Sequence, residues 1–221
     1  MSPWLEHAPA SIERRYDRLA PLYGLLDWLY LLPLLRIRER TVSRLRLRPG
    51  ETVLEVGCGS GRNLPLLVAG VGAAGSVLGV DLSAGMLERA RGLCRRRGFT
   101  NVELTKADAM EYVPRSPPNA VLFCFSYSAI PERSRVLASA WGALAPGGRL
   151  VITDLSLSEG RGLRFVLPFA SWYSRRSLLG KPDTEPWRDL ASHAGAIERE
   201  RVSLGGLGHF HICSASKRTN P

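Results

Sequence analysis

The sequence predicts an α/β fold built around a mainly parallel sheet. From residue 51 onward, short runs rich in β-branched residues alternate with segments of helical periodicity, which is the pattern of strand–helix–strand units. Three closely spaced glycines join the first run to the first helical segment. The chain of 221 residues, 45% of them hydrophobic, can bury one ordinary core. This composition excludes a disordered or collagen-like polymer.

The N-terminal segment, residues 1–48, is predicted to be helical and to lie outside the alternating pattern. One helix begins after Ser11, a suitable capping residue, and runs to about residue 31 with a second half that is apolar almost all round. A second helix begins at Pro33, which is tolerated in a first turn, and continues toward the stop at Pro49 and Gly50.

Six arginines of the second helix leave two interpretations open. Either these arginines form a solvated helix surface, or they form a basic collar beside an apolar helix that lies at a membrane interface. The arginines are Arg36, Arg38, Arg40, Arg44, Arg46 and Arg48.

Neither a secretion signal nor a membrane span is expected. The first twenty residues carry charges where a signal peptide needs an uninterrupted apolar run. The most apolar stretch, residues 19–35, is interrupted by Asp27 and two prolines, whereas a spanning helix needs ~20 apolar residues. The four cysteines form no disulfide or zinc pattern. We therefore expect a cytoplasmic protein without a metal site.

The alternating region contains seven predicted strands. They cover residues 52–56, 76–80, 101–105, 120–125, 149–153, 197–203 and 209–214. Helices are predicted from about residue 62, from the cap Ser83 to residue 97, from Pro131 to about 144, and around 187–194. Residues 155–184 lose the periodicity and are predicted to be an insert rich in aromatic and basic side chains. Residues 49–221 are thus predicted as one domain behind the N-terminal helices.

The glycine loop predicts a cofactor site. Closely spaced glycines between a strand and a helix expose backbone N–H groups and let a ligand approach the chain. A dinucleotide fingerprint needs a further glycine where Arg62 stands, so NAD is disfavoured. Glu55 precedes the loop and Asp81 follows the next strand. A carboxylate such as Asp81 can take both ribose hydroxyls, and Glu55 beneath the loop favours a cationic or zwitterionic cofactor over a phosphate.

Four motifs in this region resemble those of class I S-adenosylmethionine-dependent methyltransferases. They are VLEVGCGSGRN, GVDLSAGML, DAM at 108–110 and LAPGGRLVITD at 144–154. The resemblance implies a doubly wound, Rossmann-like, seven-stranded sheet with an antiparallel final strand and an N-terminal helical cap. It also implies S-adenosylmethionine as cofactor, with glycines at the methionine part, Asp81 on the ribose, Asp108 with Ala109 at the adenine, and Phe125 with Ser126 beside the sulfonium. The residues expected to contact the cofactor are Glu55, Gly57, Cys58, Gly59, Gly61, Asn63, Asp81, Leu82, Met86, Asp108, Ala109, Phe125 and Ser126.

The N-terminal string YDRLAPLYGLLD resembles a helix of bacterial phosphatidylethanolamine N-methyltransferases and of quinone-biosynthesis C-methyltransferases. Gly24 stands where those enzymes usually have Asp. In such enzymes this helix covers the cofactor, so the resemblance implies that Tyr16 and Tyr23 touch the cofactor carboxylate or the methyl acceptor. Packing of both tyrosines in the core is the alternative.

The strings GCGSGRNL and FSYSAIP resemble the N-methyltransferases that build betaine lipids. The resemblance places Tyr127 where the acceptor meets the methyl group, as an orienting or proton-accepting residue, with a wall residue as the alternative. His193, His209 and His211 rank below it as groups for proton transfer.

The formal charge of +10 favours polyanionic partners without choosing among them. The fourth strand is not followed by the Asn/Asp-Pro-Pro-Tyr/Phe string that is typical of enzymes that methylate nucleic-acid amines. Nucleic acid is therefore disfavoured as a partner. Basic and apolar segments suit an anionic membrane surface. We therefore predict methyl transfer to the amine of a lipid or amphipathic headgroup, with a peripheral position at the cytoplasmic membrane. The alternatives are C-methylation of a prenylated quinone or other small molecule, and a non-catalytic cofactor-binding module at a membrane surface.

Overall fold

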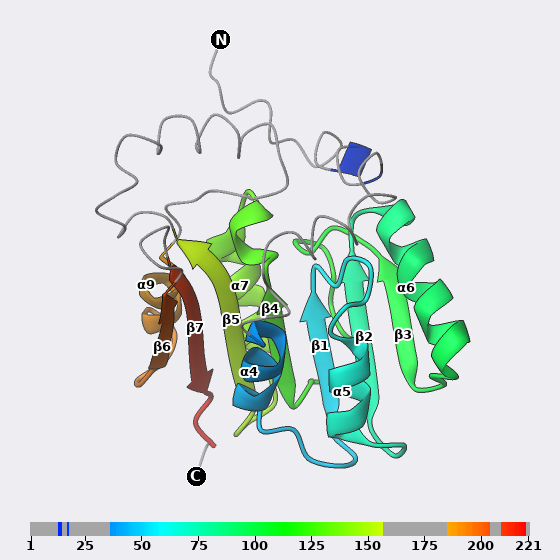
Figure 1. Cartoon of the computed structure of the whole chain (residues 1–221). Helices are drawn as coiled ribbons and strands as arrows, with labels where there is room; N and C mark the ends of the chain where they lie inside the picture. The colour runs from blue at the N-terminus through cyan, green and yellow to red at the C-terminus, as the bar shows by residue number, and fades with distance from the viewer. Residues whose placement is uncertain (1–12, 15–16, 18–35, 157–184, 204–208, 220–221) are drawn as a thin grey trace.

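The computed structural model describes residues 13–14, 17, 36–156, 185–203 and 209–219. One sheet runs through the described chain in the strand order β3-β2-β1-β4-β5-β7-β6 (Figure 1). Its strands are β1 (Thr52–Val56), β2 (Ser76–Asp81), β3 (Val102–Lys106), β4 (Ala120–Cys124), β5 (Arg149–Ser156), β6 (Glu198–Ser203) and β7 (His209–Ser216). The helices are α4 (Ile37–Arg44), α5 (Leu64–Val71), α6 (Ala84–Arg97), the 3₁₀ turn η3 (Tyr127–Ala129), α7 (Arg133–Ala143) and α9 (Pro186–Ala191).

The strand directions confirm the predicted doubly wound sheet. β1 pairs in parallel with β2 and β4, and β2–β3 and β4–β5 are also parallel. β7 pairs antiparallel with both β5 and β6, so the antiparallel final strand is confirmed as well. The strand order reverses at β1 and β4, where open α/β sheets bind ligands outside the carboxyl ends of their strands.

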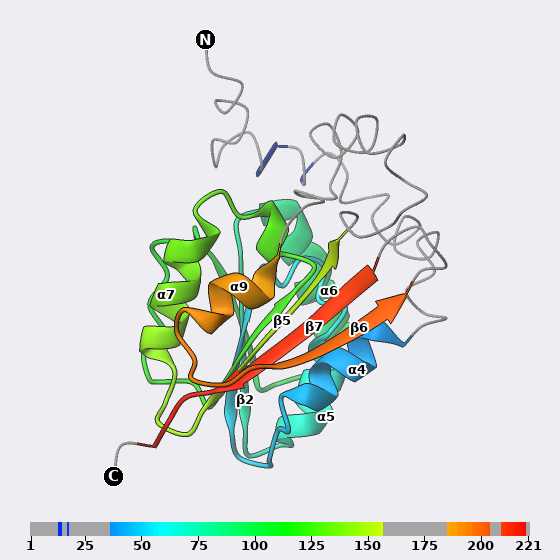
Figure 2. The same cartoon turned by 90° about the vertical axis from the view of Figure 1, so that its left-hand side faces the viewer.

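Helices cover both faces of the sheet (Figure 2). On one face, α4, α5 and α6 pack on a core that includes Val53, Leu122 and Val151. On the other face, α7 and α9 pack on a core that includes Phe123 and Ile152. The strands alternate their side chains between these two cores, as parallel strands covered on both faces must.

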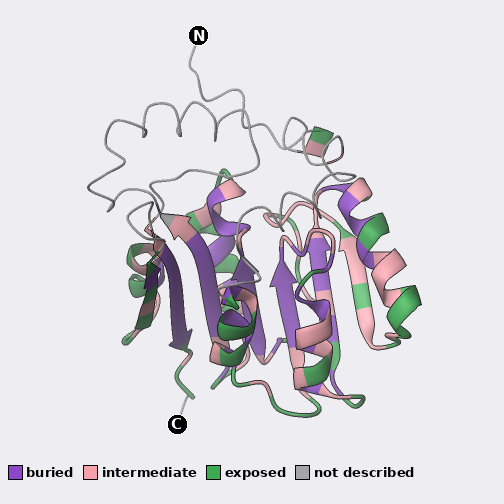
Figure 3. Cartoon of the chain, in the orientation of Figure 1, coloured by how far each residue is buried: buried purple, intermediate pink, exposed green. Residues whose placement is uncertain are grey.

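Burial follows from this layering (Figure 3). Every residue of β4 is buried, as its continuous apolar sequence predicts. The edge strands β3 and β6 are only partly covered. The centre of the sheet is therefore buried, and its edges are partly exposed.

The helix α6 begins and ends where the sequence predicts. The Ser83 side chain accepts a hydrogen bond from the Met86 N–H, and Gly98 ends the helix in a left-handed conformation. Asp17 of the N-terminal segment also accepts the Gly85 N–H at 2.9 Å. A carboxylate at this end of a helix is favourable because the unsatisfied N–H groups carry positive partial charge.

The second predicted helix is shorter than expected, since α4 ends at Arg44 and not at Pro49. The chain turns at Arg46, whose φ is 48°. Arg149 Nε binds the Leu45 carbonyl at 2.7 Å and Arg149 Nη2 binds the Arg46 carbonyl at 3.0 Å. The helix end is therefore satisfied by a side chain 103 to 104 residues away in sequence, which local sequence patterns cannot reveal.

The predicted insert begins later than expected, because β5 continues to Ser156 through an eight-residue antiparallel pairing with β7. Residues 157–184, and most of the predicted N-terminal helix, lie outside the described residues. Glu13, Arg14 and Asp17 of that helix are described and helical. Among the described residues, no helix has the length and apolar character needed to cross a membrane.

Three arginines of the predicted basic collar pair with glutamates of β6. Arg40 and Arg44 pair with Glu200 at 3.4 and 2.6 Å, and Arg46 pairs with Glu198 at 2.9 Å. Both glutamates lie on β6, so these charges stabilise the contact between α4 and the sheet edge. Because these three arginines are paired with glutamates, they are not all available to bind anionic lipid headgroups. Arg38 instead faces a pocket, described next.

Candidate cofactor and methyl-transfer site

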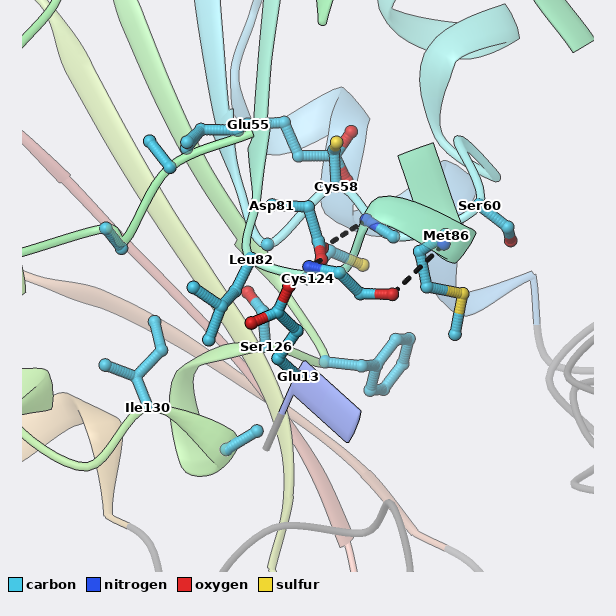
Figure 4. Close-up of a pocket in the computed structure, with 18 of the residues that line it drawn as sticks. Glu13, Glu55, Cys58, Ser60, Asp81, Leu82, Met86, Cys124, Ser126 and Ile130 are labelled. Atoms are coloured by element: carbon cyan, nitrogen blue, oxygen red, sulfur yellow. Dashed lines mark hydrogen bonds between the residues drawn. The ribbon is translucent and has the colours of Figure 1, made fainter. Parts of the chain in front are cut away.

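A pocket of about 120 Å³ lies at the carboxyl ends of β1, β2 and β4. Figure 4 shows Glu55 and Cys58 from the first strand and its loop, Asp81 and Leu82 from the second, and Cys124 and Ser126 from the fourth, around one space. The pocket therefore sits at the reversal of strand order, where ligand sites occur in doubly wound sheets.

The glycine loop after β1 forms one wall of the pocket. Gly57, Gly59 and Gly61 have φ values of 72°, 54° and 81°, a region that residues with a Cβ avoid. A Cβ on Gly57 would lie 2.4 Å from the Ser126 Cβ, whereas a Cβ on Gly59 would meet no heavy atom within 4 Å. Gly57 is thus required for packing, and Gly59 leaves space for a ligand.

Asp81 holds this loop in place. Its Oδ2 accepts the Gly59 N–H at 2.7 Å and its Oδ1 accepts the Ser83 N–H at 2.9 Å. Burial raises the pKa of Asp81, and these backbone hydrogen bonds oppose the rise. Each carboxylate oxygen has a second lone pair, so Asp81 could also accept hydrogen bonds from a ligand's hydroxyl groups.

A second carboxylate, Glu55, lies below the loop and is 1% exposed. Its Oε1 accepts a hydrogen bond from Asn63 Nδ2 at 2.5 Å. Its Oε2 is buried and has no hydrogen-bond partner among the described residues. Burial raises the pKa of Glu55 to about 7 against the opposing effects of Asn63 and Arg38. A buried acceptor without a donor is costly unless a ligand supplies one.

The opposite wall of the pocket follows β4. Phe125 has φ 60° and places its ring 5.6 Å from Phe210, in an edge-to-face arrangement. Ser126 donates its hydroxyl to the Val56 carbonyl at 2.6 Å. Ala129, Ile130 and Pro131 complete this side. The segment from 125 to 131 presents only apolar groups and one hydroxyl that already has an acceptor.

The predicted role of Tyr127 does not fit its position. Its side chain is 0% exposed and lies in the core beneath α7 and α9, where its hydroxyl donates to Asp189 Oδ2 at 2.7 Å. Burial and the neighbouring carboxylate raise its pKa, and Tyr127 does not line the pocket. We therefore correct the prediction that it contacts the acceptor. Tyr16 and Tyr23 lie outside the described residues.

Most residues predicted to contact the cofactor line the pocket. They are Glu55, Gly57, Cys58, Gly59, Asp81, Leu82, Met86, Asp108, Ala109, Phe125 and Ser126. Gly61 and Asn63 do not line it. A Cβ on Gly61 would collide with Leu64 and Ala90, so this glycine is required for packing. Asn63 contacts the pocket only indirectly, by donating a hydrogen bond to Glu55.

Three charged residues that the sequence analysis did not assign to the site line the pocket: Glu13, Arg38 and Arg62. Arg38 was one arginine in a run of similar residues, and only the tertiary structure singles it out. Glu13 pairs with Lys106 at 2.6 Å, which attaches the N-terminal segment to the end of β3.

No metal centre is found among the described residues. Burial raises the pKa of the Cys58 thiol well above its usual range, which argues against a reactive thiolate. His209 and His211 lie on one face of β7, with ring centroids 6.3 Å apart. Neither histidine lines the pocket.

The pocket fits S-adenosylmethionine on three observations of the structure. Gly59 leaves an open approach to the loop, Asp81 is positioned to accept hydroxyl groups, and Glu55 offers a buried oxygen without a donor. A nucleoside with a cationic amino-acid end satisfies all three, whereas a pyrophosphate would be repelled by both carboxylates.

Part of the chain matches a known protein family. Residues 53–148 match a protein family described as a methyltransferase domain. A demethylmenaquinone methyltransferase of Listeria welshimeri is 27% identical over 190 residues, which cover 79% of this chain and 80% of the relative.

Solved structures show the same fold. A methyltransferase from Aquifex aeolicus, described as S-adenosylmethionine-dependent, has a TM-score of 0.61 and 22% identity, over 81% of this chain and 88% of the other. The phosphoethanolamine N-methyltransferase 2 of Haemonchus contortus, solved in complex with S-adenosylmethionine, has a TM-score of 0.67 and 17% identity, over 83% and 53%.

These findings confirm the predicted fold. Residues 53–148 match a methyltransferase domain, and the chain has the fold of solved methyltransferases.

Proposed function

We propose that this chain is a methyltransferase that uses S-adenosylmethionine and transfers its methyl group to a ring carbon of a reduced, prenylated quinone. The observation that carries the proposal is the wall after β4, where Phe125, Ala129, Ile130 and Pro131 face the pocket without an ionisable group. Such a wall suits a flat aromatic ring with an apolar tail. The name of the Listeria relative, demethylmenaquinone methyltransferase, supports the same class of acceptor.

The cofactor would lie along the glycine loop. We assign the ribose hydroxyls to Asp81 and the adenine end to Asp108 and Ala109, which line the same pocket. Asp108 is itself held by the Met110 N–H at 2.9 Å. When bound, S-adenosylmethionine supplies a methyl group from its sulfonium. The chain contributes alignment of the two reactants, which can supply up to ~7–11 kcal/mol for well-oriented groups.

C-methylation forms a ring C–CH₃ bond as the S–CH₃ bond of the cofactor breaks, and the ring proton is lost to water afterwards. No proton has to leave this acceptor before the transfer, unlike the amine acceptor that the sequence favoured. An amine with a pKa of ~10.4 is protonated at pH 7, and release of its proton costs roughly 4–5 kcal/mol. A nearby group must then help to remove that proton. Tyr127, the residue predicted for this role, donates to Asp189 and lies outside the pocket. The amine of a lipid headgroup is therefore the less supported acceptor.

The test supplies purified protein with S-adenosylmethionine and one acceptor at a time. The acceptors are a reduced demethylated menaquinone with a short prenyl tail, phosphatidylethanolamine in detergent, and phosphoethanolamine. We expect mass spectrometry to show one added methyl group on the quinol only, and nuclear magnetic resonance to place it on a ring carbon. Methylation of either amine with an unchanged quinol would refute the proposal.

Two variants distinguish a specific reaction from a contaminating activity. Asp81→Asn should abolish the transfer, because it removes the carboxylate assigned to the ribose. Glu88→Gln is a matched control on the exposed side of α6, where Glu88 pairs with Arg95 at 3.0 Å. This variant should retain the wild-type rate.

A prenylated acceptor resides in a membrane, so an anionic membrane surface remains the proposed partner of the basic chain. Flotation with anionic and neutral vesicles tests this partner. Preferential binding to anionic vesicles that falls with added salt is expected, because such attraction is screened. Equal, negligible binding to both would remove the membrane from the proposal without affecting the assignment of the acceptor.

A further inference from the structure

A second pocket lies at the other end of the sheet from the cofactor site. It has a volume of about 320 Å³ and lies where β5 begins and β7 ends, at the lower edge of the sheet in Figure 1. Four arginines line it, which are Arg44, Arg46, Arg149 and Arg218. Glu198 is the one carboxylate that the described residues contribute to its wall. The pocket is therefore basic.

The ion pairs beside α4 do not neutralise this charge. Arg44 Nη1 lies 3.2 Å from Glu198 Oε2, and Arg46 Nη2 lies 2.9 Å from Glu198 Oε1. Glu200 pairs with Arg44 at 2.6 Å and with Arg40 at 3.4 Å, so three arginines share two glutamates. Arg46 uses only Nη2 in hydrogen bonds to the described residues. The N–H groups on its Nε and Nη1 remain for another acceptor.

Arg218 adds a guanidinium that no carboxylate neutralises. It lines the pocket without an ion pair or hydrogen bond to the described residues. Its Nη2 lies over Gly195, 3.2 Å from the position that a Cβ on this glycine would take. Arg149, by contrast, is matched by Glu51 at 2.5 Å. Arg218 and Arg46 thus supply the donors that a bound anion could use.

The turn that brings Arg46 to the pocket is strained. Arg46 has a φ of 48°, a region that residues with a Cβ avoid, and the Arg149 side chain holds its carbonyl at 3.0 Å. Strain of this kind is often retained where a ligand is bound. Contacts that serve packing alone would leave little empty space, whereas here a pocket remains between the arginines.

A phosphate group carries several acceptor oxygens in tetrahedral directions, so arginines from separate segments can bind it together. Arg46 follows α4 and Arg218 follows β7, and Ser214 and Ser216 add hydroxyl groups to the wall. We propose that this pocket binds a phosphate group, carried by a soluble phosphate compound or by a phospholipid headgroup. The site is separate from the cofactor pocket and does not depend on the proposed methyl transfer.

Calorimetry with inorganic pyrophosphate tests the site at low salt, where charge attraction is least screened. Arg218→Gln should weaken binding at least fivefold. Arg96→Gln is the matched control, because Arg96 is an exposed residue of α6 and its loss changes the net charge equally. This control should change the affinity less than twofold. Glu198→Gln removes the carboxylate of the pocket and should strengthen binding at least threefold, whereas Glu88→Gln on α6 should have no effect.

Flotation tells the two sources of phosphate apart, and thermal unfolding checks that each variant is folded. The vesicles contain phosphatidylcholine alone or with phosphatidic acid. Loss of binding to phosphatidic acid in Arg218→Gln, and not in Arg96→Gln, assigns a lipid headgroup. Unchanged flotation together with the calorimetric loss assigns a soluble compound. Binding of neither pyrophosphate nor phosphatidic acid, or equal weakening by the two arginine variants, overturns the proposal.

Discussion

The Tyr127 hydroxyl donates a hydrogen bond to Asp189 Oδ2 at 2.7 Å and so ties the turn after β4 to α9. Arg133 Nε lies 3.5 Å from the same carboxylate oxygen, and the Tyr127 ring packs edge-to-face on Phe123 with centroids 5.6 Å apart. The turn η3 also receives support from β5, because the Ser128 N–H donates to Asp154 at 2.7 Å. Two carboxylates therefore hold the segment whose other side forms the apolar wall.

Tyr127→Phe is expected to lower the free energy of unfolding and to leave the rate of methyl transfer unchanged. Loss of the hydroxyl leaves a partly buried carboxylate with one donor fewer, which should lower the free energy of unfolding by about 1–2 kcal/mol. The affinity for S-adenosylmethionine should stay within twofold. Urea denaturation and calorimetry measure the two quantities.

Thr41→Val is the control for this change, since it removes another buried hydroxyl, one that lies 2.9 Å from the Thr153 hydroxyl. Both variants should lose similar stability. A loss of more than a hundredfold in the rate of methyl transfer for Tyr127→Phe, at unchanged stability, would restore the catalytic role that the sequence suggested.

Glu55 should make the stability of the cofactor-free protein depend on pH. Its pKa is about 7 in the folded chain against a usual value of 4.5, so the folded state holds the proton more strongly than the unfolded state. The contribution is complete below pH 4.5 and is lost as the pH rises through 7, with a total of about 3 kcal/mol. Denaturant unfolding at several pH values measures this loss.

Glu55→Gln keeps the shape and removes the titration. Its free energy of unfolding should fall less than that of the wild type between pH 4.5 and 8. Asp154, whose pKa burial raises to about 6, titrates in both proteins and cancels in the comparison. Parallel pH profiles for wild type and variant would contradict the assignment of a raised pKa to Glu55.

The fold was predictable from sequence because its signals are local. An apolar run such as β4 must be covered on both faces, and Ser83 caps a helix through a group three residues away. The loop glycines and Asp81 were predictable for the same reason, since the spacing of strand ends sets their positions. The end of α4 was not, because the donor that satisfies it, Arg149, is distant in sequence.

The candidate site was harder to predict where the role of a residue depends on the direction in which its side chain points. Phe125 and Tyr127 both follow β4, and the sequence does not say which faces the pocket. The left-handed φ of Phe125, 60°, turns the chain so that Phe125 lines the pocket and Tyr127 points toward α9. Arg38 was hidden for another reason: its partners Asn63 and Cys124 lie 25 and 86 residues away.

Arg149→Met should destabilise the junction between α4 and the sheet. Arg149 binds Glu51 through Nη1 at 2.7 Å and Nη2 at 2.5 Å and also holds the Leu45 carbonyl. Both partners of the ion pair are 14% exposed, so the loss should approach that of a buried pair, about 2–4 kcal/mol. Arg135→Met, an exposed change on α7, should stay within ~0.5 kcal/mol. Equal midpoints in urea for the two variants would show that the Arg149 contacts contribute little.

Two glycine variants separate packing from ligand space in the loop. Gly57→Ala combines a left-handed φ of 72° with a contact of 2.4 Å to the Ser126 Cβ, and strain plus overpacking should cost about 2–5 kcal/mol. Gly59→Ala has a φ of 54° and no heavy atom within 4 Å of the new Cβ, so its cost should be only the backbone strain of about 1–2 kcal/mol.

The affinity for S-adenosylmethionine should show a separate effect of Gly59→Ala. The space beside Gly59 is the approach that we assign to the cofactor, so a methyl group there should weaken binding at least tenfold in a protein that remains folded. Calorimetry on Gly59→Ala, with thermal unfolding of both variants, measures each effect independently. Wild-type affinity in Gly59→Ala would place the cofactor away from this loop, and equal stability of the two variants would contradict the packing role of Gly57.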